Sequence, residues 1–396
     1  MIKNLVVFLS PDWEISYRAS MFREIARQLA ERNGQVICLN RPAFVLSDLL
    51  TNPKRWLRAF SNKPVKLGSN LTVLRPKLLI HPLIARHIPF IQKHQKRVYL
   101  KQVEDLLKAE GFLPEDTFLW ISHPYQFMEM DMPANYKVVF ERYDKYDKAV
   151  GLSAGLSGLV SKLEQALLKR ADLVITTASK LAVELNAHKE KVYHLPNSAD
   201  YEFFSGIATA PDIKNGLAND IKPPVIGYLG TIHEGIDMDL LLKLVELKKE
   251  WTFLLVGPVQ SGKLAEDKRF IELKSLSNVI MTGWLGWDLL PGYLKLFNVG
   301  IIPYRLDCEF NRYVDPNKFH EYMAMGLPIV STSLPEMEKY SEWVEMTDAP
   351  ETFVTAIEAV LKQDDESLKS QRKNYAKENS WQQRAAKIIN LMDKIA

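Results

Sequence analysis

The sequence predicts an α/β chain of two doubly wound, Rossmann-like domains that face each other across a cleft. One observation is a series of short, continuous apolar runs, which are typical of parallel strands buried on both faces. A second is that these runs alternate with stretches of helical periodicity. The third is length, because 396 residues with 47% apolar and 25% charged side chains favour two globular domains over one.

The first domain is predicted over residues 1–204. It opens with a strand at 5–9, and a helix from about 16 to 33 follows and ends at Gly34. Further strands are predicted at 36–39, 117–122, 137–142 and 173–176, with a helix at about 158–170 before the last of them. We therefore expect one parallel sheet covered by helices.

Residues 205–224 read as a linker, because turn-forming pairs such as Asn215-Gly216 replace periodic apolar positions. The strand and helix pattern then restarts and predicts a second domain over 225–375. Its strands are expected at 225–230, 252–256, 279–282, 299–303 and 329–331, with a helix at 239–249. Residues 376–396 predict a last helix whose apolar stripe packs across the domain junction.

Composition excludes several classes of protein. The net charge of +3 argues against bulk binding of nucleic acid. The two cysteines, Cys38 and Cys308, provide neither a disulfide framework nor paired metal ligands, which indicates a reducing cytoplasm. No apolar run is long enough for a signal peptide or a membrane span. The sequence thus predicts a cytoplasmic protein with no metal site.

The most informative segment is a short helix that follows the strand at 299–303. Asp315 is expected to cap it, Pro316 to occupy its first position, and Gly326 to end it. Free amides and the helix dipole favour a phosphate at such an N-terminus, and Lys318 adds a cation there. Glu321 lies one turn deeper on the same face, where a carboxylate suits the vicinal hydroxyls of a ribose.

This segment, Pro316-Asn317-Lys318-x-x-Glu321-Tyr322-x-Ala324-x-Gly326-x-Pro328-Ile329-Val330, resembles the donor-binding signature of bacterial group-1 glycosyltransferases with the GT-B fold. Residues 171–177 and 195–200 look like the end of that family's acceptor domain, and 226–231 look like the start of its nucleotide domain. The resemblance implies transfer of a sugar from a nucleotide-diphosphate donor to an acceptor, with no cofactor beyond the donor. It also implies that Lys318 contacts the diphosphate and that Glu321 holds the ribose.

The segment also departs from the family pattern. Tyr313 occupies the position where many members carry a second glutamate, and residues 231–235 lack the usual basic pair after the glycine turn. These departures leave both retaining and inverting transfer open. Backbone amides at the glycine turn can still approach a phosphate. The remaining residues predicted for the donor site are Gly230, Thr231, Arg305, Glu309 and Asn317.

Acceptor activation in an inverting transfer needs a group that takes the proton of the attacking hydroxyl. Asp144, after the strand at 137–142, is the first candidate, and His123 and Asp147 are the alternatives. Each of these side chains also has a structural interpretation as a cap or a hydrogen-bonded loop residue. The loop after the first strand supplies three predicted acceptor contacts, which are Asp12, Trp13 and Arg18.

A basic stretch distinguishes the first half of the chain. No acidic residue lies between Asp48 and Glu104, whereas twelve lysines and arginines do, interleaved with residues such as Ile84 and Phe90. Basic and apolar residues together suit a surface that lies on an anionic bilayer. Segment 54–101 therefore predicts peripheral association with the inner face of the membrane. The acceptor would then be a lipid-linked sugar or a growing polysaccharide.

Two other functions stay open at this point. Non-hydrolysing sugar-nucleotide epimerases share the two-domain plan, and a degenerate subunit that only binds a sugar nucleotide would explain the missing family residues. A nicotinamide-dependent dehydrogenase is disfavoured, because no G-x-G-x-x-G follows the first strand. The basic stretch contains no recognised nucleic-acid-binding module.

Overall fold

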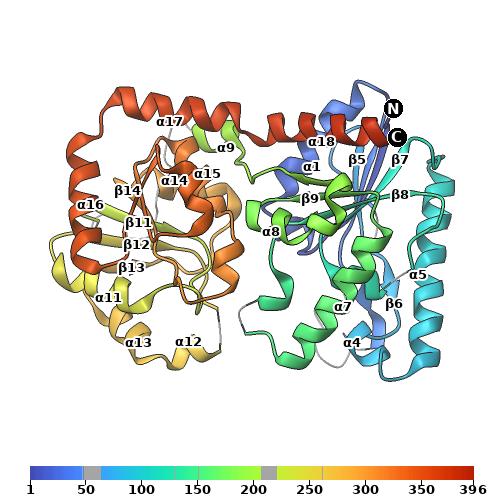
Figure 1. Cartoon of the computed structure of the whole chain (residues 1–396), viewed down its shortest axis with the longest axis horizontal. Coiled ribbons are helices and arrows are strands. Elements are labelled where there is room, and N and C mark those ends of the chain that lie inside the picture. Colours follow the sequence, from blue (N-terminus) through green and yellow to red (C-terminus); the bar gives the residue numbers. More distant parts are fainter. Residues whose placement is uncertain (47, 49–63, 130, 150, 207–220, 261) are drawn as a thin grey trace. The chain divides into compact units, whose positions relative to one another are not determined.

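The computed structural model describes residues 1–46, 48, 64–129, 131–149, 151–206, 221–260 and 262–396. They form two compact units, each with a mainly parallel sheet and surrounding helices (Figure 1). The first unit comprises residues 1–177, 181–195 and 382–396, and the second comprises 178–180 and 196–381. The two-domain α/β fold predicted from the sequence is confirmed.

The first unit is built on an eight-stranded sheet with the order β10-β9-β8-β7-β1-β2-β5-β4. Every described pairing in it is parallel except that of β4 with β5. All residues of the central strands β1, β2 and β7 are buried, which explains their uninterrupted apolar sequences. The strands are β1 (Asn4–Phe8), β2 (Val36–Leu39), β4 (Val65–Lys66), β5 (Leu71–Leu74), β7 (Thr117–Ile121), β8 (Lys137–Arg142), β9 (Leu173–Thr176) and β10 (Val192–His194).

Helices cover this sheet, and β3 (Ala43–Phe44) pairs with β6 (Lys77–Leu78) beside it. In α1 the buried residues Phe22, Ile25 and Leu29 recur at helical spacing, as the sequence predicted. The helices of this unit are α1 (Ala19–Ala30), α4 (Pro82–Ala85), α5 (Pro89–Ala109), α6 (Pro124–Glu129), α7 (Ala154–Arg170), most of α8 (Ser179–Glu184) and α18 (Trp381–Ile395).

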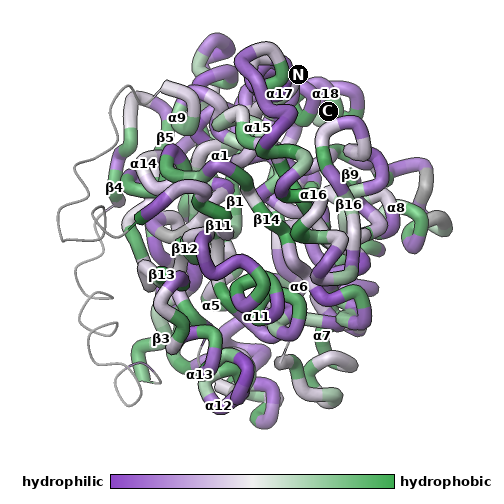
Figure 2. Tube along the Cα trace, turned by 90° about the vertical axis from the view of Figure 1, so that its left-hand side faces the viewer, coloured by the Kyte–Doolittle hydropathy of each residue, from purple (hydrophilic) through white to green (hydrophobic). Residues whose placement is uncertain are grey.

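The second unit is built on a six-stranded parallel sheet with the order β13-β12-β11-β14-β15-β16. Its strands are β11 (Val225–Leu229), β12 (Thr252–Val256), β13 (Val279–Met281), β14 (Val299–Ile302), β15 (Ile329–Ser331) and β16 (Val344–Met346). Its helices are α9 (Tyr201–Ser205), α11 (Met238–Leu247), α12 (Lys263–Glu266), α13 (Lys268–Ser275), α14 (Leu290–Leu294), α15 (Asn317–Met325), α16 (Pro350–Gln363) and α17 (Glu366–Glu378). Green and purple segments alternate in α11 (Figure 2), which buries Leu241 and Leu244 on one side.

Most predicted strands occur within one or two residues of their expected bounds, and β2, β8, β9, β12 and β15 match them fully. The units differ from the predicted domain bounds in three places, because residues 178–180 and 196–204 belong to the second unit and 382–396 return to the first. Residues 207–220 of the predicted linker lie outside the described residues. Within the described ranges, no helix is both long and apolar enough to cross a membrane.

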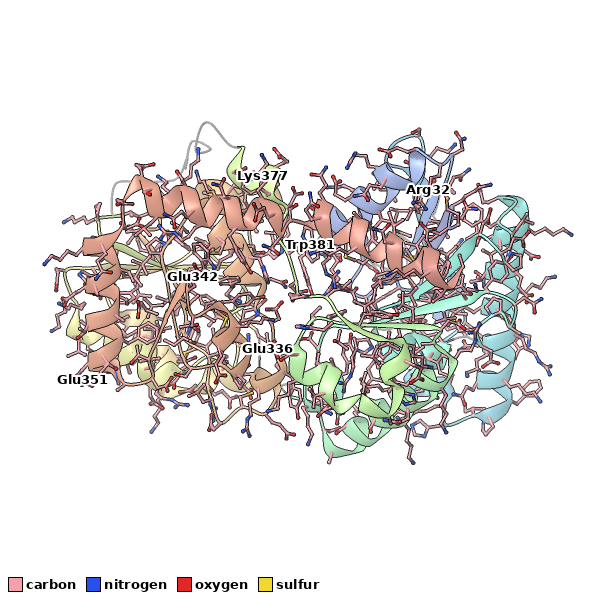
Figure 3. The ribbon with its side chains drawn as sticks, turned by 45° about the horizontal axis from the view of Figure 1, so that its top comes forward. Arg32, Glu336, Glu342, Glu351, Lys377 and Trp381 are labelled. Atoms are coloured by element: carbon pink, nitrogen blue, oxygen red, sulfur yellow. The ribbon has the colours of Figure 1, made fainter. Side chains whose placement is uncertain are left out.

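The helix α18 is tied to the first unit by two sets of polar contacts. Arg384 donates from Nη2 to Oε1 of the buried Glu141 at 2.9 Å, and Arg18 pairs with the same carboxylate oxygen. Asp393 accepts hydrogen bonds at 2.8 Å from Arg32, labelled in Figure 3, and from the backbone N–H of Ile2. The apolar stripe of α18, which includes the fully buried Ala385, Ile388 and Met392, is thereby covered.

Two paired glycines allow α15 to lie close to the second sheet. Gly227 of β11 is opposite Gly300 of β14. A Cβ atom on Gly300 would lie 2.5 Å from the Tyr322 ring, and one on Gly227 would lie 2.1 Å from the Phe297 ring. The hydroxyl oxygen of Tyr322 accepts the backbone N–H of Leu229 at 2.8 Å. The sheet therefore holds α15 by shape and by a hydrogen bond.

We expect Gly300→Ala to destabilise the second unit by about 2–3 kcal/mol, because the added methyl group overlaps the Tyr322 ring. Urea unfolding followed by tryptophan fluorescence measures the change. Gly155→Ala in α7 is the control, since a Cβ atom there meets nothing within 4 Å. The control should be neutral or slightly stabilising. Equal midpoints for Gly300→Ala and the wild type would contradict this account of how α15 is held.

Candidate functional site

The helix that the sequence singled out is α15, with Asn317 as its first residue and Pro316 as its N-cap. Gly326 ends the helix in the left-handed conformation, with φ +76°, as the sequence predicted. The predicted start is wrong by one residue, because Pro316 precedes the helix rather than opening it and Asp315 does not cap it. The first turn therefore has no side-chain cap.

Asp315 is instead a buried acceptor that fastens neighbouring segments together. Its Oδ2 accepts from the backbone N–H of Asn197 at 2.7 Å and lies 3.2 Å from Nε2 of His320, and its Oδ1 accepts from the Tyr340 hydroxyl at 3.0 Å. Burial alone would raise the pKa of this carboxyl, but His320 and Lys339 hold it well below its usual range. Both oxygens of the Asp315 carboxylate thus have hydrogen-bond partners inside the second unit.

Lys318 lies at the carboxyl end of β11. Its Nζ donates to the Tyr304 hydroxyl at 2.7 Å and lies 4.8 Å from the centre of the Tyr228 ring. A Cβ atom on Gly230 would be only 2.8 Å from the same Nζ. The structure therefore brings together two residues, Gly230 and Lys318, that the sequence predicted from separate motifs. The lysine ammonium therefore lies beside the end of β11, where glycine has no side chain.

Glu321 is buried one turn further along α15, with 8% of its surface exposed. Burial disfavours the charged form and raises the pKa of the carboxyl to about 7, and Lys318 partly offsets this effect. No hydrogen bond joins its carboxylate to another described residue. Such a carboxylate can accept hydrogen bonds from the hydroxyl groups of a ligand.

His233 is a neighbour that the sequence analysis missed. Its Nδ1 accepts the backbone N–H of Gly235 at 3.0 Å, and its ring centre lies 5.9 Å from that of Tyr304. Burial and the charge of Lys318 lower the pKa of His233 to about 4. The imidazole is therefore neutral at pH 7, with its proton on Nε2. We call Gly230, His233, Tyr304, Lys318 and Glu321 the donor-site cluster.

Glycines also end the two strands beyond β11. Gly230, Gly257 and Gly283 all have positive φ, and Gly257 is bridged to Gly283. A Cβ atom on Gly257 would meet the carbonyl oxygen of Gly230 at 2.4 Å, so side chains are excluded from this edge. Trp284 follows directly and is 68% exposed. The edge offers backbone groups and an indole surface to a ligand.

The other predicted donor-site residues lie around this cluster. Thr231 is exposed and its carbonyl accepts the Tyr228 hydroxyl at 2.9 Å. Asn317 is half-buried, with an Oδ1 that has no hydrogen-bond partner. Arg305 pairs with Asp307 at 2.6 Å and lines a cavity of about 470 Å³, while Glu309 is exposed. In the described part of the chain, no group of three or more His, Cys, Asp or Glu side chains could hold a metal ion.

Two predicted base candidates lie after β8 in the first unit. Asp144 is half-buried and makes no hydrogen bond or ion pair with another described residue. Burial raises the pKa of Asp144 to about 7, and Arg18 acts in the opposite direction. Asp147 lies in η2 (Tyr146–Lys148) and pairs with Lys145 at 3.6 Å. Asp144 is thus the less constrained carboxyl group.

His123, the third candidate, follows β7. Its Nδ1 accepts the backbone N–H of Tyr125 at 3.2 Å, and the two rings stack with centres 5.0 Å apart. Burial, together with the charge of Arg41, lowers the pKa of His123 to about 4. The neutral ring therefore carries its proton on Nε2 and offers a donor rather than an acceptor there.

The three predicted acceptor contacts are engaged within the first unit. Asp12 accepts from Arg75 Nη2 and from the backbone N–H of Arg41, both at 2.8 Å. Trp13 is buried, and its backbone N–H donates to Asn40 Oδ1 at 2.8 Å. Arg18 is buried against Glu141, with its guanidinium 4.4 Å from the centre of the Tyr143 ring. Their contacts position the loops around the carboxyl ends of the strands.

Comparison with known proteins agrees with this architecture. The family Glycosyl transferases group 1 matches residues 223–363, which contain the donor-site cluster. TuaH of Bacillus subtilis (strain 168), assigned as a teichuronic acid biosynthesis glycosyltransferase, is 34% identical over 257 residues. That match covers 60% of this chain and 63% of TuaH, so it spans less than two thirds of the relative.

Solved structures share the fold along nearly the whole chain. Sucrose-phosphate synthase from Thermosynechococcus elongatus matches with a TM-score of 0.67 and 14% identity, covering 99% of both chains. WaaG, a glycosyltransferase involved in lipopolysaccharide biosynthesis, matches with a TM-score of 0.62 and 15% identity over 97% of this chain and 99% of its own. HepE of Anabaena in complex with UDP matches with a TM-score of 0.61 and 11% identity over 99% of this chain and 100% of its own. The comparisons therefore show a match to group 1 glycosyltransferases over residues 223–363 and a shared fold with these solved structures along nearly the whole chain.

Proposed function

We propose that this protein transfers a sugar from a nucleotide-diphosphate donor to a hydroxyl group of a glycan or lipid-linked acceptor. The observation that carries the proposal is the donor-site cluster, in which a lysine ammonium and a buried carboxyl group lie at a glycine-lined strand edge. A diphosphate and a ribose need this combination of a cation, accessible backbone amides and a hydroxyl acceptor.

Three members of the cluster would contact the donor directly. Lys318 and the Nε2–H of His233 neutralise and hydrogen-bond the diphosphate, and Glu321 accepts the ribose hydroxyls. Trp284 offers a surface on which the base stacks. Binding of UDP by HepE, which shares the fold, supports a nucleoside diphosphate as the common part of the donor.

The first unit supplies the acceptor side of the reaction. The acceptor oxygen attacks the anomeric carbon, the bond from that carbon to the diphosphate oxygen breaks, and the electron pair leaves with the nucleoside diphosphate. The hydroxyl proton moves to Asp144, whose pKa of about 7 suits a general base near neutral pH. His123 offers a donor rather than a lone pair, and Asp147 pairs with Lys145, so Asp144 is the base in this proposal.

A basic and apolar corner of the first unit supports a membrane-bound acceptor. Around the turn between α4 and α5, Ile84, Ile88 and Phe90 are exposed, and Phe90 is 82% exposed. Arg86, Lys93 and Arg97 lie in the same segment. Exposed apolar side chains flanked by cations suit the interface of an anionic bilayer. The protein would then act at the inner face of the membrane, on a precursor of a wall or capsule polymer.

Lys318→Ala should weaken binding of a nucleoside diphosphate by about 10- to 100-fold, because a charge-assisted contact contributes about 1.5–3 kcal/mol. Thermal-shift titration with several nucleoside diphosphates identifies the tightest ligand of the wild type, and calorimetry then gives its Kd for both proteins. Lys274→Ala is the control, since Lys274 is exposed on α13. A variant that binds as tightly as the wild type would remove Lys318 from the donor site.

Asp144→Asn should lower hydrolysis of the matching nucleotide sugar by about 100-fold or more, because it removes the base. Wild-type hydrolysis should rise with pH through about 7, where the carboxyl group loses its proton, and the variant should lose that rise. Initial rates between pH 5.5 and 8.5 give the two profiles, and Asp105→Asn on the exposed side of α5 is the control. Unchanged profiles in Asp144→Asn would exclude this role. Donor binding without hydrolysis in the wild type would favour the degenerate binding subunit.

Phe90→Asp should reduce binding to phosphatidylglycerol vesicles, because it places a charge where the apolar ring enters the interface. Vesicle co-sedimentation at low and high salt measures the effect, and wild-type binding should weaken as salt increases. Ile271→Asp, at an exposed apolar position of the second unit, is the control. Equal wild-type recovery on phosphatidylcholine and phosphatidylglycerol vesicles at low salt would contradict the membrane proposal.

A further inference from the structure

A cavity of about 310 Å³ lies at the carboxyl ends of the first unit's central strands. The strand order reverses at β1, since β2 lies on one side of it and β7 on the other. Ligands of open α/β sheets bind outside the strand ends at such a reversal. Ser10 follows β1, Arg41 follows β2 and His123 follows β7, and all three line the cavity. The cavity therefore occupies the position where this fold binds ligands.

His123, one of the two histidines that line this cavity, is held in one orientation by hydrogen bonds to its backbone and its ring. Gln126 donates to the carbonyl of Phe8 at 2.7 Å, and its Oε1 accepts the backbone N–H groups of Ser122 and His123 at 3.1 and 3.0 Å. Together with the bond from Tyr125 N–H to Nδ1, these contacts fix the ring. A fixed neutral ring keeps one donor, Nε2–H, for a ligand.

Hydrogen bonds fix the backbone of Arg41, while its side chain can contact a ligand. Asp12 accepts its N–H and Arg75 donates to its carbonyl, both at 2.8 Å, and Asp12 and Arg75 also pair with each other. The guanidinium makes no hydrogen bond or ion pair with another described residue, and the residue is exposed. A planar guanidinium binds carboxylates and phosphates through two parallel hydrogen bonds.

The rest of the lining suits a sugar. Pro82, Leu83 and the Tyr125 ring give apolar surface for a sugar ring. Ser10 adds a hydroxyl group that can hydrogen-bond a sugar, and His81 and Glu129 also line the cavity. His81 repeats the local geometry of His123, because its Nδ1 accepts the backbone N–H of Leu83 at 3.2 Å. The cavity thus combines an oxyanion-binding group with groups for hydroxyls and a ring face.

We propose that this cavity binds an anionic sugar residue of the acceptor, with its oxyanion on the Arg41 guanidinium and on the Nε2–H of His123. This inference rests on the proposed transferase function, which it deepens by giving the acceptor a charge. The oxyanion is either the carboxylate of a uronic acid or the phosphate ester of a lipid-linked sugar. Asp12 is then a positioning residue, because it acts through the backbone of Arg41.

Binding of three probes to the full chain tests the proposal. Glucuronic acid, glucose 1-phosphate and glucose are titrated by ligand-observed NMR against the wild type and the variants Arg41→Gln and Arg41→Lys. We expect at least one charged probe to bind about 10-fold or more tightly than glucose, and that preference to be lost in Arg41→Gln. Arg41→Lys should retain part of it, because a lysine keeps the charge without the bidentate geometry.

The controls separate this proposal from its alternatives. Lys101→Gln removes an exposed cation from α5 and should leave probe binding unchanged, and thermal midpoints show whether each variant is folded. Preference for glucuronic acid identifies a uronate acceptor, and preference for glucose 1-phosphate identifies a phosphate-bearing one. Equal binding of all three probes, or binding that Arg41→Gln does not change, would overturn the proposal. Nucleoside diphosphate titration of the wild type, run in parallel, tests the transferase function independently.

Discussion

The second unit depends on the close packing of α15 against its sheet, at two strand positions where glycine leaves the backbone without a side chain. Without side chains at Gly227 and Gly300, Phe297 and Tyr322 reach the sheet surface, and their rings meet edge to face with centres 6.2 Å apart. The Tyr322 hydroxyl then takes up the last N–H of β11. Lys318 and Glu321 precede that tyrosine on the same short helix, so their position relative to Gly230 is set by packing rather than by their own charges. Asp315 secures the other end of this arrangement through Asn197 and Tyr340.

The sequence predicted the strands well because its strongest signal, the short continuous apolar run, corresponds to strands that the fold buries on both faces. Strands such as β2 and β12 lie inside parallel sheets and are buried at every position, so they stand out in the sequence as short apolar runs. The basic stretch was harder to interpret. Its charges obscured β5, whose residues alternate between buried and half-buried, and the long helix α5, whose buried positions include the polar Gln95.

The site could be predicted only where sequence chemistry and spacing coincide. Lys318 and Glu321 were found from one helix, and Gly230 from a strand end. His233 and Tyr304 were missed because neither belongs to a spacing pattern, and they join the cluster only when β11 and β14 become neighbours. The error at Asp315 has a similar cause. Its sequence position suits a helix cap, but a residue distant in sequence, Asn197, competes for the same carboxylate. Asp12 and Arg18 stand beside strand ends as expected, yet their partners, Arg75 and Glu141, show that they support neighbouring loops.

The return of residues 382–396 to the first unit has a consequence for synthesis. Trp381, labelled in Figure 3, donates its backbone N–H to Ala199 at 3.0 Å in the second unit, and the chain then continues into α18. Glu141 is buried in the first unit, and one of its two arginine partners, Arg384, lies on α18. A nascent chain that has emerged only as far as the second unit still lacks Arg384 and the strip of Ile388 and Met392. The amino-terminal half can therefore complete its core only after translation of α18, and gene fragments cut between the halves would leave that half without the buried apolar residues of this helix.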